Sequence, residues 1–179
     1  MVYVTAALVL VGVVAGLNLV LTFGVIRRLR QHSELLAARG LRPTPQPPSP
    51  GDPVGGFRTT TVDGETVTRD TLPAGSLVVF FSPGCPPCEE HLPGLVARLR
   101  ESDRPRAETL AVVLGEAGES AHMVEQLTPV ALVVRETAPS TLLQTAFGVW
   151  SAPIALVVDG STIREVFTDV GEAAVLAAA

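Results

Sequence analysis

Two cysteines are the residues of this chain whose type and spacing could perform chemistry. Cys85 and Cys88 are the only cysteines in 179 residues, and two prolines separate them. Thiols three residues apart can close a disulfide when a turn or the start of a helix brings their sulfurs together. We therefore expect a redox dithiol that cycles between thiol and disulfide, with no cofactor, because the sulfurs themselves carry the electrons.

The two sulfurs should have different roles because they differ in their place in the expected helix. Cys85 would lie at the helix N-terminus, where unpaired N–H groups and the helix dipole stabilise a thiolate, so we assign it the attacking role. Cys88 lies one turn further in and would resolve the mixed disulfide.

The residues around the sulfurs should moderate this reactivity. Pro86 and Pro87 have no N–H to donate, and Glu89 and Glu90 place negative charge close to the sulfurs. Both features weaken stabilisation of a thiolate at Cys85. We expect a pair that is less oxidising than the strongly oxidising dithiols.

A strand and a helix must meet at this dithiol to position it. The run from Leu77 to Phe81 is continuously apolar, which is typical of a central strand buried on both faces. Pro87 suits a first helical turn, and apolar residues recur at helical spacing between Leu92 and Leu99. A strand that ends near Ser82 would thus lead directly into the helix.

The remaining pattern predicts an α/β fold, a mixed β-sheet flanked by helices, because strands alternate with helices before a final hairpin and helix. We expect Met123 and Trp150 to pack in or near the core. The other predicted elements are a hairpin over 57–68 that turns at Asp63-Gly64, strands over 109–114 and 131–134, helices over 120–127 and 141–147, a hairpin over 154–168 that turns at Asp159-Gly160, and a closing helix over 172–179.

Several of these motifs, in this order, resemble the membrane-anchored thioredoxin-fold proteins of the TlpA type, and among them the MauD-like disulfide oxidoreductases. The resemblance covers most of the chain after residue 53. The motifs that carry it are Thr61-Val62-Asp63-Gly64, Leu77 to Phe81, Cys85-Pro86-Pro87-Cys88, Leu92-Pro93 and Ala152-Pro153-Ile154.

The resemblance implies a thioredoxin-like fold and a protein-disulfide oxidoreductase activity. Its partners would be protein substrates with disulfides or thiols and a protein that exchanges electrons with the dithiol. It also implies a cis peptide bond between Ala152 and Pro153 that faces the dithiol. Pro153 would then complete the catalytic site, and the backbone of Ala152 would pair with a substrate chain. Pro86 and Pro87 are assigned to the same substrate-binding surface.

The chain departs from this family at two points. Gly84 stands where a tryptophan usually precedes the first cysteine, while the only tryptophan is Trp150. A buried carboxylate often accepts the proton in these proteins, and here Glu116 and Glu119 are the candidates we can name.

A metal site is one alternative for the cysteines. Cys85, Cys88 and His91 could supply three ligands, with His32 or His122 as a fourth. Structural zinc sites usually contain two ligand pairs, and only one pair exists here, so we expect no metal.

A peroxiredoxin-like thiol peroxidase is a second alternative. Ser82 lies three residues before Cys85, where that class has Thr or Ser, but Val78 occupies the position of its expected proline. A third alternative is a non-catalytic, membrane-tethered binding or metal-chaperone module, in which the cysteines would form a static disulfide.

The N-terminal third of the chain differs in composition from the rest. Residues 2–26 contain no charged side chain and would span roughly 37 Å as a helix, enough to cross a bilayer. Six prolines between 43 and 53 disfavour helix and strand pairing. We expect a single transmembrane anchor with a basic collar over 1–30, a polar, proline-rich stalk over 31–53 and the thioredoxin-like domain over 54–179.

The charge of the chain bears on its partners and its location. Residues 54–179 contain 8 arginines and 16 acidic residues, and such a surface repels phosphate backbones, which argues against nucleic acid. Five arginines follow the apolar segment, so the positive-inside rule places the domain in the cytoplasm. The family resemblance implies the extracytoplasmic side, where disulfides persist, and we expect that side.

Overall fold

The computed structural model describes most of the chain from residue 47 onward as part of one compact unit over 45–179. Among the described residues, no helix is long and apolar enough to cross a bilayer. Most of the expected anchor, most of the expected stalk and most of the expected closing helix fall on residues outside the described ones. The described residues are 47–102, 104–137, 141–171 and 173, together with Tyr3, Gly12, Gly16 and Asn18.

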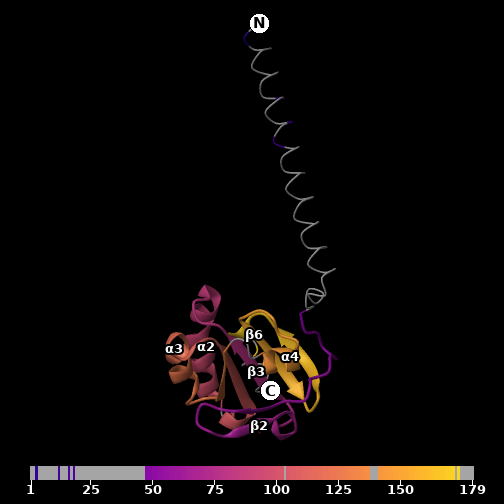
Figure 1. Ribbon diagram of the computed structural model, residues 1–179, viewed down its shortest axis with the longest axis vertical. Helices are drawn as coiled ribbons and strands as arrows, with labels where there is room; N and C mark the ends of the chain where they lie inside the picture. The colour runs from indigo at the N-terminus through magenta and orange to yellow at the C-terminus, as the bar shows by residue number, and fades with distance from the viewer. Residues whose placement is uncertain are drawn as a thin grey trace. The chain divides into compact units, whose positions relative to one another are not determined.

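A five-stranded mixed sheet, with the strand order β5-β4-β3-β6-β7, organises the domain (Figure 1). The central strand β3 (Ser76–Phe81) is buried along its whole length. It pairs in parallel with β4 (Thr109–Leu114) and antiparallel with β6 (Ile154–Asp159). The outer strands are β5 (Leu132–Glu136), parallel to β4, and β7 (Thr162–Phe167), antiparallel to β6. The expected mixed sheet is confirmed.

Helices cover both faces of this sheet (Figure 1). Helices α2 (Pro86–Glu101) and α3 (Ala117–Leu127) lie on one face, and α4 (Leu142–Phe147) lies on the other. Successive side chains of a strand point to opposite faces, so β3 contributes to two separate hydrophobic clusters. Leu77, Val79 and Phe81 belong to the cluster under α2, and Val78 and Phe80 to the cluster under α4.

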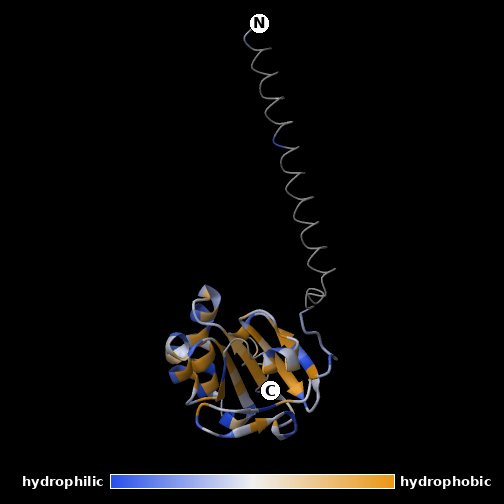
Figure 2. Cartoon of the chain, viewed as in Figure 1, coloured by the Kyte–Doolittle hydropathy of each residue, from blue (hydrophilic) through white to orange (hydrophobic). Residues whose placement is uncertain are grey.

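Helix α2 forms where the apolar spacing predicted it. Pro86 and Pro87 occupy its first two positions, where the missing N–H groups would have no partner within the helix. The central strands of the five-stranded sheet are strongly hydrophobic, whereas hydrophilic residues lie on the outer sides of the helices (Figure 2). The residues that α2 buries are Cys88, Leu92, Leu95, Val96 and Leu99.

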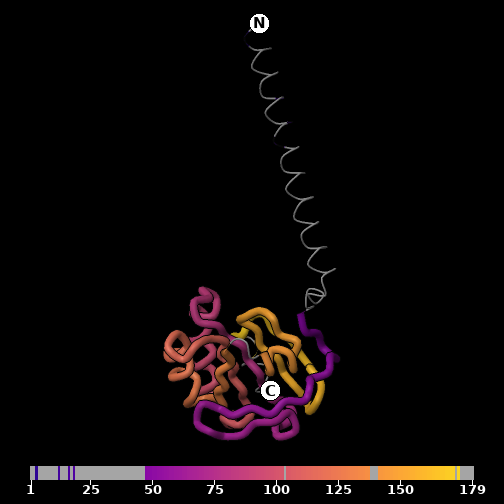
Figure 3. Tube along the Cα trace, viewed as in Figure 1, coloured from indigo at the N-terminus to yellow at the C-terminus, as the bar shows by residue number. Residues whose placement is uncertain are grey.

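A small hairpin of β1 (Arg58–Thr60) and β2 (Thr66–Thr68) precedes the main sheet, and its purple tube runs along the lower side of the domain (Figure 3). Its turn lies where Asp63-Gly64 predicted it, with Gly64 at φ +86°. The turn between β6 and β7 likewise includes Gly160, at φ +59°. These positive φ angles favour glycine, which explains why the two turns were recognisable in the sequence.

Three predictions about individual segments need adjustment. Helix α3 begins three residues before 120, and β5 runs to residue 136 rather than 134. Met123 is fully buried as expected, but the prediction that Trp150 packs in or near the core is wrong, because its side chain is 39% exposed. Gly148 ends α4 in the left-handed conformation, and it is the next residue, Val149, that enters the core.

The proline-rich segment pairs with the sheet at its C-terminal end, and the prediction of no strand pairing is wrong there. The N–H groups of Gly51 and Val54 donate to the carbonyl oxygens of Ile163 and Ser161, at 2.8 and 2.7 Å. Between these two residues, Pro53 forms an isolated antiparallel β-bridge with Thr162. A proline removes only its own donor, so the residues on either side can still pair with an edge strand.

A close contact between Gly115 and Pro83 provides a test of the packing. Gly115 follows β4, and Pro83 lies in the loop before α2. A Cβ atom at Gly115 would lie 2.6 Å from Cγ and 2.9 Å from Cδ of Pro83. Because the pyrrolidine ring cannot rotate away, we expect Gly115→Ala to lower the free energy of unfolding by about 1–3 kcal/mol.

Gly118→Ala is the matched control, because nothing lies within 4 Å of its added Cβ and the residue belongs to α3. This change should be neutral or should stabilise the protein by up to about 1 kcal/mol. Urea denaturation of the full-length chain measures both variants. Equal stabilities would contradict the described contact.

Candidate active site

The register of the sheet brings two distant parts of the chain together. Phe80, near the end of β3, pairs with Ile154, the first residue of β6. Ala152 and Pro153 immediately precede β6, and Cys85 follows β3 after a short loop. Both segments therefore leave the sheet at the same end and meet there.

Cys85 lies at the junction of these segments. It is the N-cap residue of α2, with an extended backbone, and its side chain is partly exposed. Its Sγ atom donates a hydrogen bond to the carbonyl oxygen of Ala152 at 3.5 Å. The peptide bond between Ala152 and Pro153 is cis, which confirms the expectation from the family resemblance. The first thiol thus faces the loop before β6.

Cys88 lies beneath Cys85 and is fully buried. Both cysteines are free thiols. Burial raises the pKa of the Cys88 thiol from 9.0 to about 12. The hydrogen bond of Cys88 with the Cys85 side chain and the nearby charge of Glu89 also raise this pKa, whereas a backbone hydrogen bond from Ser82 lowers it. Cys88 therefore keeps its proton at neutral pH, and Cys85 is the thiol that a substrate can reach.

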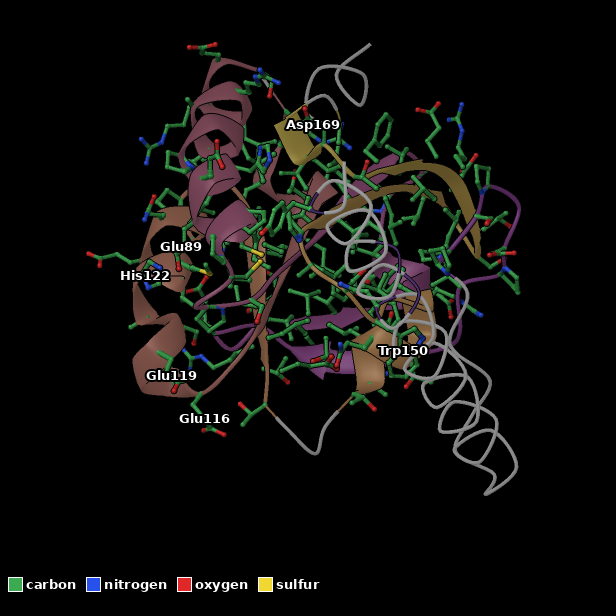
Figure 4. All side chains as sticks on the ribbon, turned by 90° about the horizontal axis from the view of Figure 1, so that it is seen from above. Glu89, Glu116, Glu119, His122, Trp150 and Asp169 are labelled. Atoms are coloured by element: carbon green, nitrogen blue, oxygen red, sulfur yellow. The ribbon has the colours of Figure 1, made fainter. Side chains whose placement is uncertain are left out.

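An ion pair bridges the two helices beside the dithiol. Nε2 of His122, on α3, lies 2.9 and 3.1 Å from the two carboxylate oxygens of Glu89, on α2 (Figure 4). From the sequence, Glu89 was expected only as a charge near the sulfurs and His122 as a possible metal ligand. The pair could not be predicted because the contact depends on how α2 packs against α3, and no spacing along the chain indicates that packing.

The two candidate proton acceptors lie at the start of α3. Glu116 is its N-cap residue, Glu119 is in its first turn, and both are exposed. They lie apart from Glu89 and His122 in the side-chain view (Figure 4). Together with Glu136 they line a surface cavity of about 260 Å³.

Glu136 is the buried carboxylate of the described part of the chain, and the sequence analysis missed it. Its side chain accepts hydrogen bonds from the backbone N–H groups of Leu143 and Gln144. These are N-terminal groups of α4, so Glu136 caps that helix. The expected strand ended at 134, which left this residue outside the predicted element.

The two histidines in the described part of the chain do not form a ligand set with the cysteines. His91 lies near Asp169, with 4.0 Å between Nδ1 and Oδ1, and His122 contacts Glu89. His32 lies outside the described residues. Within the described ranges, no group of three or more His, Cys, Asp or Glu side chains is arranged to hold a metal ion.

The burial of Cys88 predicts a loss of stability at alkaline pH. The folded state binds the thiol proton more tightly than the unfolded state, since the folded pKa of about 12 exceeds the ordinary 9.0. This contribution is full below about pH 9 and is lost as the pH rises toward 12, with a slope of up to about 1.4 kcal/mol per pH unit. We expect the reduced protein to show this slope and Cys88→Ala to lack it.

Guanidinium denaturation of the two reduced full-length proteins between about pH 8 and 11 measures the difference. Cys88→Ala also changes the packing, but that cost is the same at every pH. Parallel pH profiles for the two proteins would contradict the assignment of a strongly raised pKa to Cys88.

Comparison with known proteins places the domain in a family. Residues 50–168 match the model of the AhpC/TSA family. No curated protein shows a significant similarity to the chain.

Solved structures of similar fold include three bacterial proteins. A thiol:disulfide interchange protein of the thioredoxin family from Chlorobium tepidum has 20% identity and a TM-score of 0.54, over 73% of this chain and 99% of that chain. A thio-disulfide isomerase from Thermus thermophilus has 21% identity and a TM-score of 0.54, over 72% and 96%. A secreted disulfide oxidoreductase from Mycobacterium tuberculosis has 13% identity and a TM-score of 0.54, over 67% and 95%. These similarities confirm the thioredoxin-like fold, and the chain belongs to the AhpC/TSA family.

Proposed function

We propose that this protein is a thiol-disulfide oxidoreductase that reduces or isomerises disulfides in partner proteins. The observation that carries the proposal is the arrangement of the dithiol. A reachable Cys85 thiol lies at the start of α2 beside the Ala152 carbonyl, and a buried Cys88 thiol lies behind it. Membership of the AhpC/TSA family and the thioredoxin-like fold support it.

The reaction proceeds in two exchanges that balance. The Cys85 thiolate attacks one sulfur of a substrate disulfide, which forms a mixed disulfide and releases the first substrate thiolate. Cys88 then loses its proton and attacks the Cys85 sulfur, which releases the second substrate thiolate. Two electrons pass to the substrate, whose thiolates take up two protons, and the Cys85–Cys88 disulfide remains. A dithiol protein of the same redox class must reduce it again.

The surroundings of Cys85 suit an extended polypeptide. Ala152 and Pro153 are only half-buried, and Pro86 and Pro87, which follow Cys85 in the chain, are exposed. An incoming chain could pair with the backbone at Ala152 while its disulfide meets Cys85, as in recognition by strand addition. Disulfide-bearing protein segments are therefore the proposed substrates.

Reduction or isomerisation fits the dithiol better than oxidation does. Strongly oxidising dithiols owe their potential to a reduced form that is unusually stable as a thiolate. Here the two prolines supply no N–H groups to a Cys85 thiolate at the helix start. Burial, with the charge of Glu89 as a smaller contribution, raises the pKa of Cys88 and disfavours its thiolate.

The finer assignment is a TlpA-type, MauD-like protein that is tethered to a lipid bilayer. The uncharged segment over 2–26 supports an anchor, and the motif order supports the subgroup. We place the domain over 54–179 on the extracytoplasmic side because dithiol proteins of this kind act where disulfides persist. The arginines between 27 and 42 favour the opposite side.

Substitution of each cysteine tests the exchange mechanism. Cys88→Ser should accumulate mixed disulfides with substrate proteins, because the attack by Cys85 still occurs and the resolving sulfur is absent. Cys85→Ser should reduce a disulfide-bearing test protein no faster than buffer does. Non-reducing electrophoresis and the reductase assay measure these outcomes, with the double variant as control. A static binding module would be indicated instead if the unsubstituted protein reduced the test protein no faster than Cys85→Ser and if Cys88→Ser trapped no substrate.

A thiol peroxidase is the second candidate, because membership of the AhpC/TSA family is also compatible with this activity. The hydroxyl of Ser82, which occupies the position of a peroxidase Thr or Ser, donates to the carbonyl oxygen of Leu114 at 3.4 Å. This bond turns the hydroxyl toward β4. We expect no Cys85-dependent turnover of hydrogen peroxide by the full-length chain, and rapid turnover would favour the peroxidase.

The membrane side is tested by reporters fused after Ala179. Alkaline phosphatase folds only where disulfides form, so it reports the extracytoplasmic side. A fluorescent protein that becomes fluorescent only in the cytoplasm reports the cytoplasmic side. We expect the phosphatase fusion to be active and the fluorescent fusion to be dark. The opposite pattern would place the domain in the cytoplasm, in agreement with the positive-inside rule.

A further inference from the structure

The bridge between Glu89 and His122 lies next to the dithiol, and the two exchanges described above assign it no role. One imidazole nitrogen is within hydrogen-bonding distance of both carboxylate oxygens, at 2.9 and 3.1 Å. A carboxylate only accepts hydrogen bonds, so Nε2 must carry the hydrogen. Both side chains are a little under half exposed, at 41% and 46%, so water screens the pair only in part.

The backbone of Glu89 is fixed close to both sulfurs. Glu89 directly follows Cys88, and its N–H donates to the carbonyl oxygen of Cys85 at 3.1 Å. Only the side-chain torsions of Glu89 decide where its negative charge lies. The contact with His122 holds that carboxylate toward α3 (Figure 4).

We infer that His122 is a positioning residue for the resolving cysteine: by holding and partly neutralising the Glu89 carboxylate, it makes Cys88 easier to deprotonate in the second exchange. The inference rests on the proposed function. The charge of Glu89 acts against the thiolate of Cys88, and a protonated His122 offsets that charge. A neutral side chain at 122 leaves the carboxylate uncompensated beside the buried thiol.

The effect should depend on pH because imidazoles ordinarily change charge between about pH 5 and 8. Carboxylates and guanidinium groups ordinarily keep their charge in that range. His91, on α2 near Asp169, is a second imidazole close to the dithiol, and its contribution cancels when two proteins that both contain it are compared at the same pH. The charged residues within one helical turn of the pair along the chain are Glu90 on α2 and Glu119 and Glu125 on α3. Arg135 in β5 donates to Ser120 Oγ of α3 at 3.0 Å.

The test separates the two exchanges with an aromatic disulfide, Ellman's reagent. The Cys85 thiolate attacks it and releases one coloured aryl thiolate, which leaves a mixed disulfide. Cys88 then attacks the Cys85 sulfur and releases the second aryl thiolate, which leaves the Cys85–Cys88 disulfide. Two electrons pass to the reagent, and two protons go to the solvent. The slower release in stopped-flow records of the reduced full-length chain measures the step at Cys88.

We expect His122→Gln to slow the second release by roughly two- to fivefold near pH 6, the range typical of a partly exposed charge pair. Above about pH 8, outside the range in which imidazoles ordinarily change charge, the slowing should be smaller. Glu89→Gln should speed the second release. His122→Gln should have no effect in the Glu89→Gln background, where no charge remains to be offset.

Glu90→Gln is the matched control, because it removes a carboxylate from the same helical turn without touching the bridge. His122→Gln should keep its full effect in that background. A merely structural role would give equal slowing at pH 6 and 8, or no dependence on Glu89, and either result would overturn the inference.

The experiment also distinguishes failure of the inference from failure of the proposed function. If both releases occur but His122→Gln leaves the second unchanged near pH 6, His122 does not position the site, while the dithiol still cycles. If only one aryl thiolate is released from the unsubstituted protein, Cys88 does not resolve the mixed disulfide, and both proposals fail.

Discussion

The central strand β3 is the constraint on which the site depends. It is buried on both faces and is hydrogen-bonded on both sides, to β4 in parallel and to β6 antiparallel. A strand held in this way cannot shift its register without moving every side chain to the opposite face of the sheet. Its fixed end therefore sets where Cys85 emerges, and its ladder with β6 sets where Ala152 lies. The contact between the thiol and the carbonyl follows from this register.

The two sulfurs differ in chemistry because one is partly exposed to solvent and the other is buried. Cys85 precedes the first turn of α2 and remains partly exposed, whereas Cys88 belongs to the hydrophobic stripe that the same helix buries. Burial alone makes the second thiol a poor acid, and the neighbouring charge of Glu89 adds to this. A dithiol with one accessible and one protected sulfur is suited to ordered, two-step exchange.

Features encoded over short stretches of the chain could be predicted from the sequence. The spacing of the cysteines, the apolar run of β3 and the glycine turns at Gly64 and Gly160 each reflect local backbone geometry. The cis bond before Pro153 required the family resemblance. Contacts between elements far apart in the chain could not be predicted, because each depends on packing: the bridge from Glu89 to His122, the cap that Glu136 places on α4, and the pairing of Gly51 with β7.

The pairing of residues 51–54 with β7 has a consequence for how the domain behaves at high concentration. The N–H of Val62 donates to the carbonyl oxygen of Val133 at 2.8 Å, so the opposite border strand, β5, is also partly covered by an earlier segment. Exposed borders of a β-sheet template the addition of strands from other molecules, which leads to fibres and precipitates. Here segments of the same polypeptide occupy part of each border, which protects the folded protein against self-assembly through its sheet.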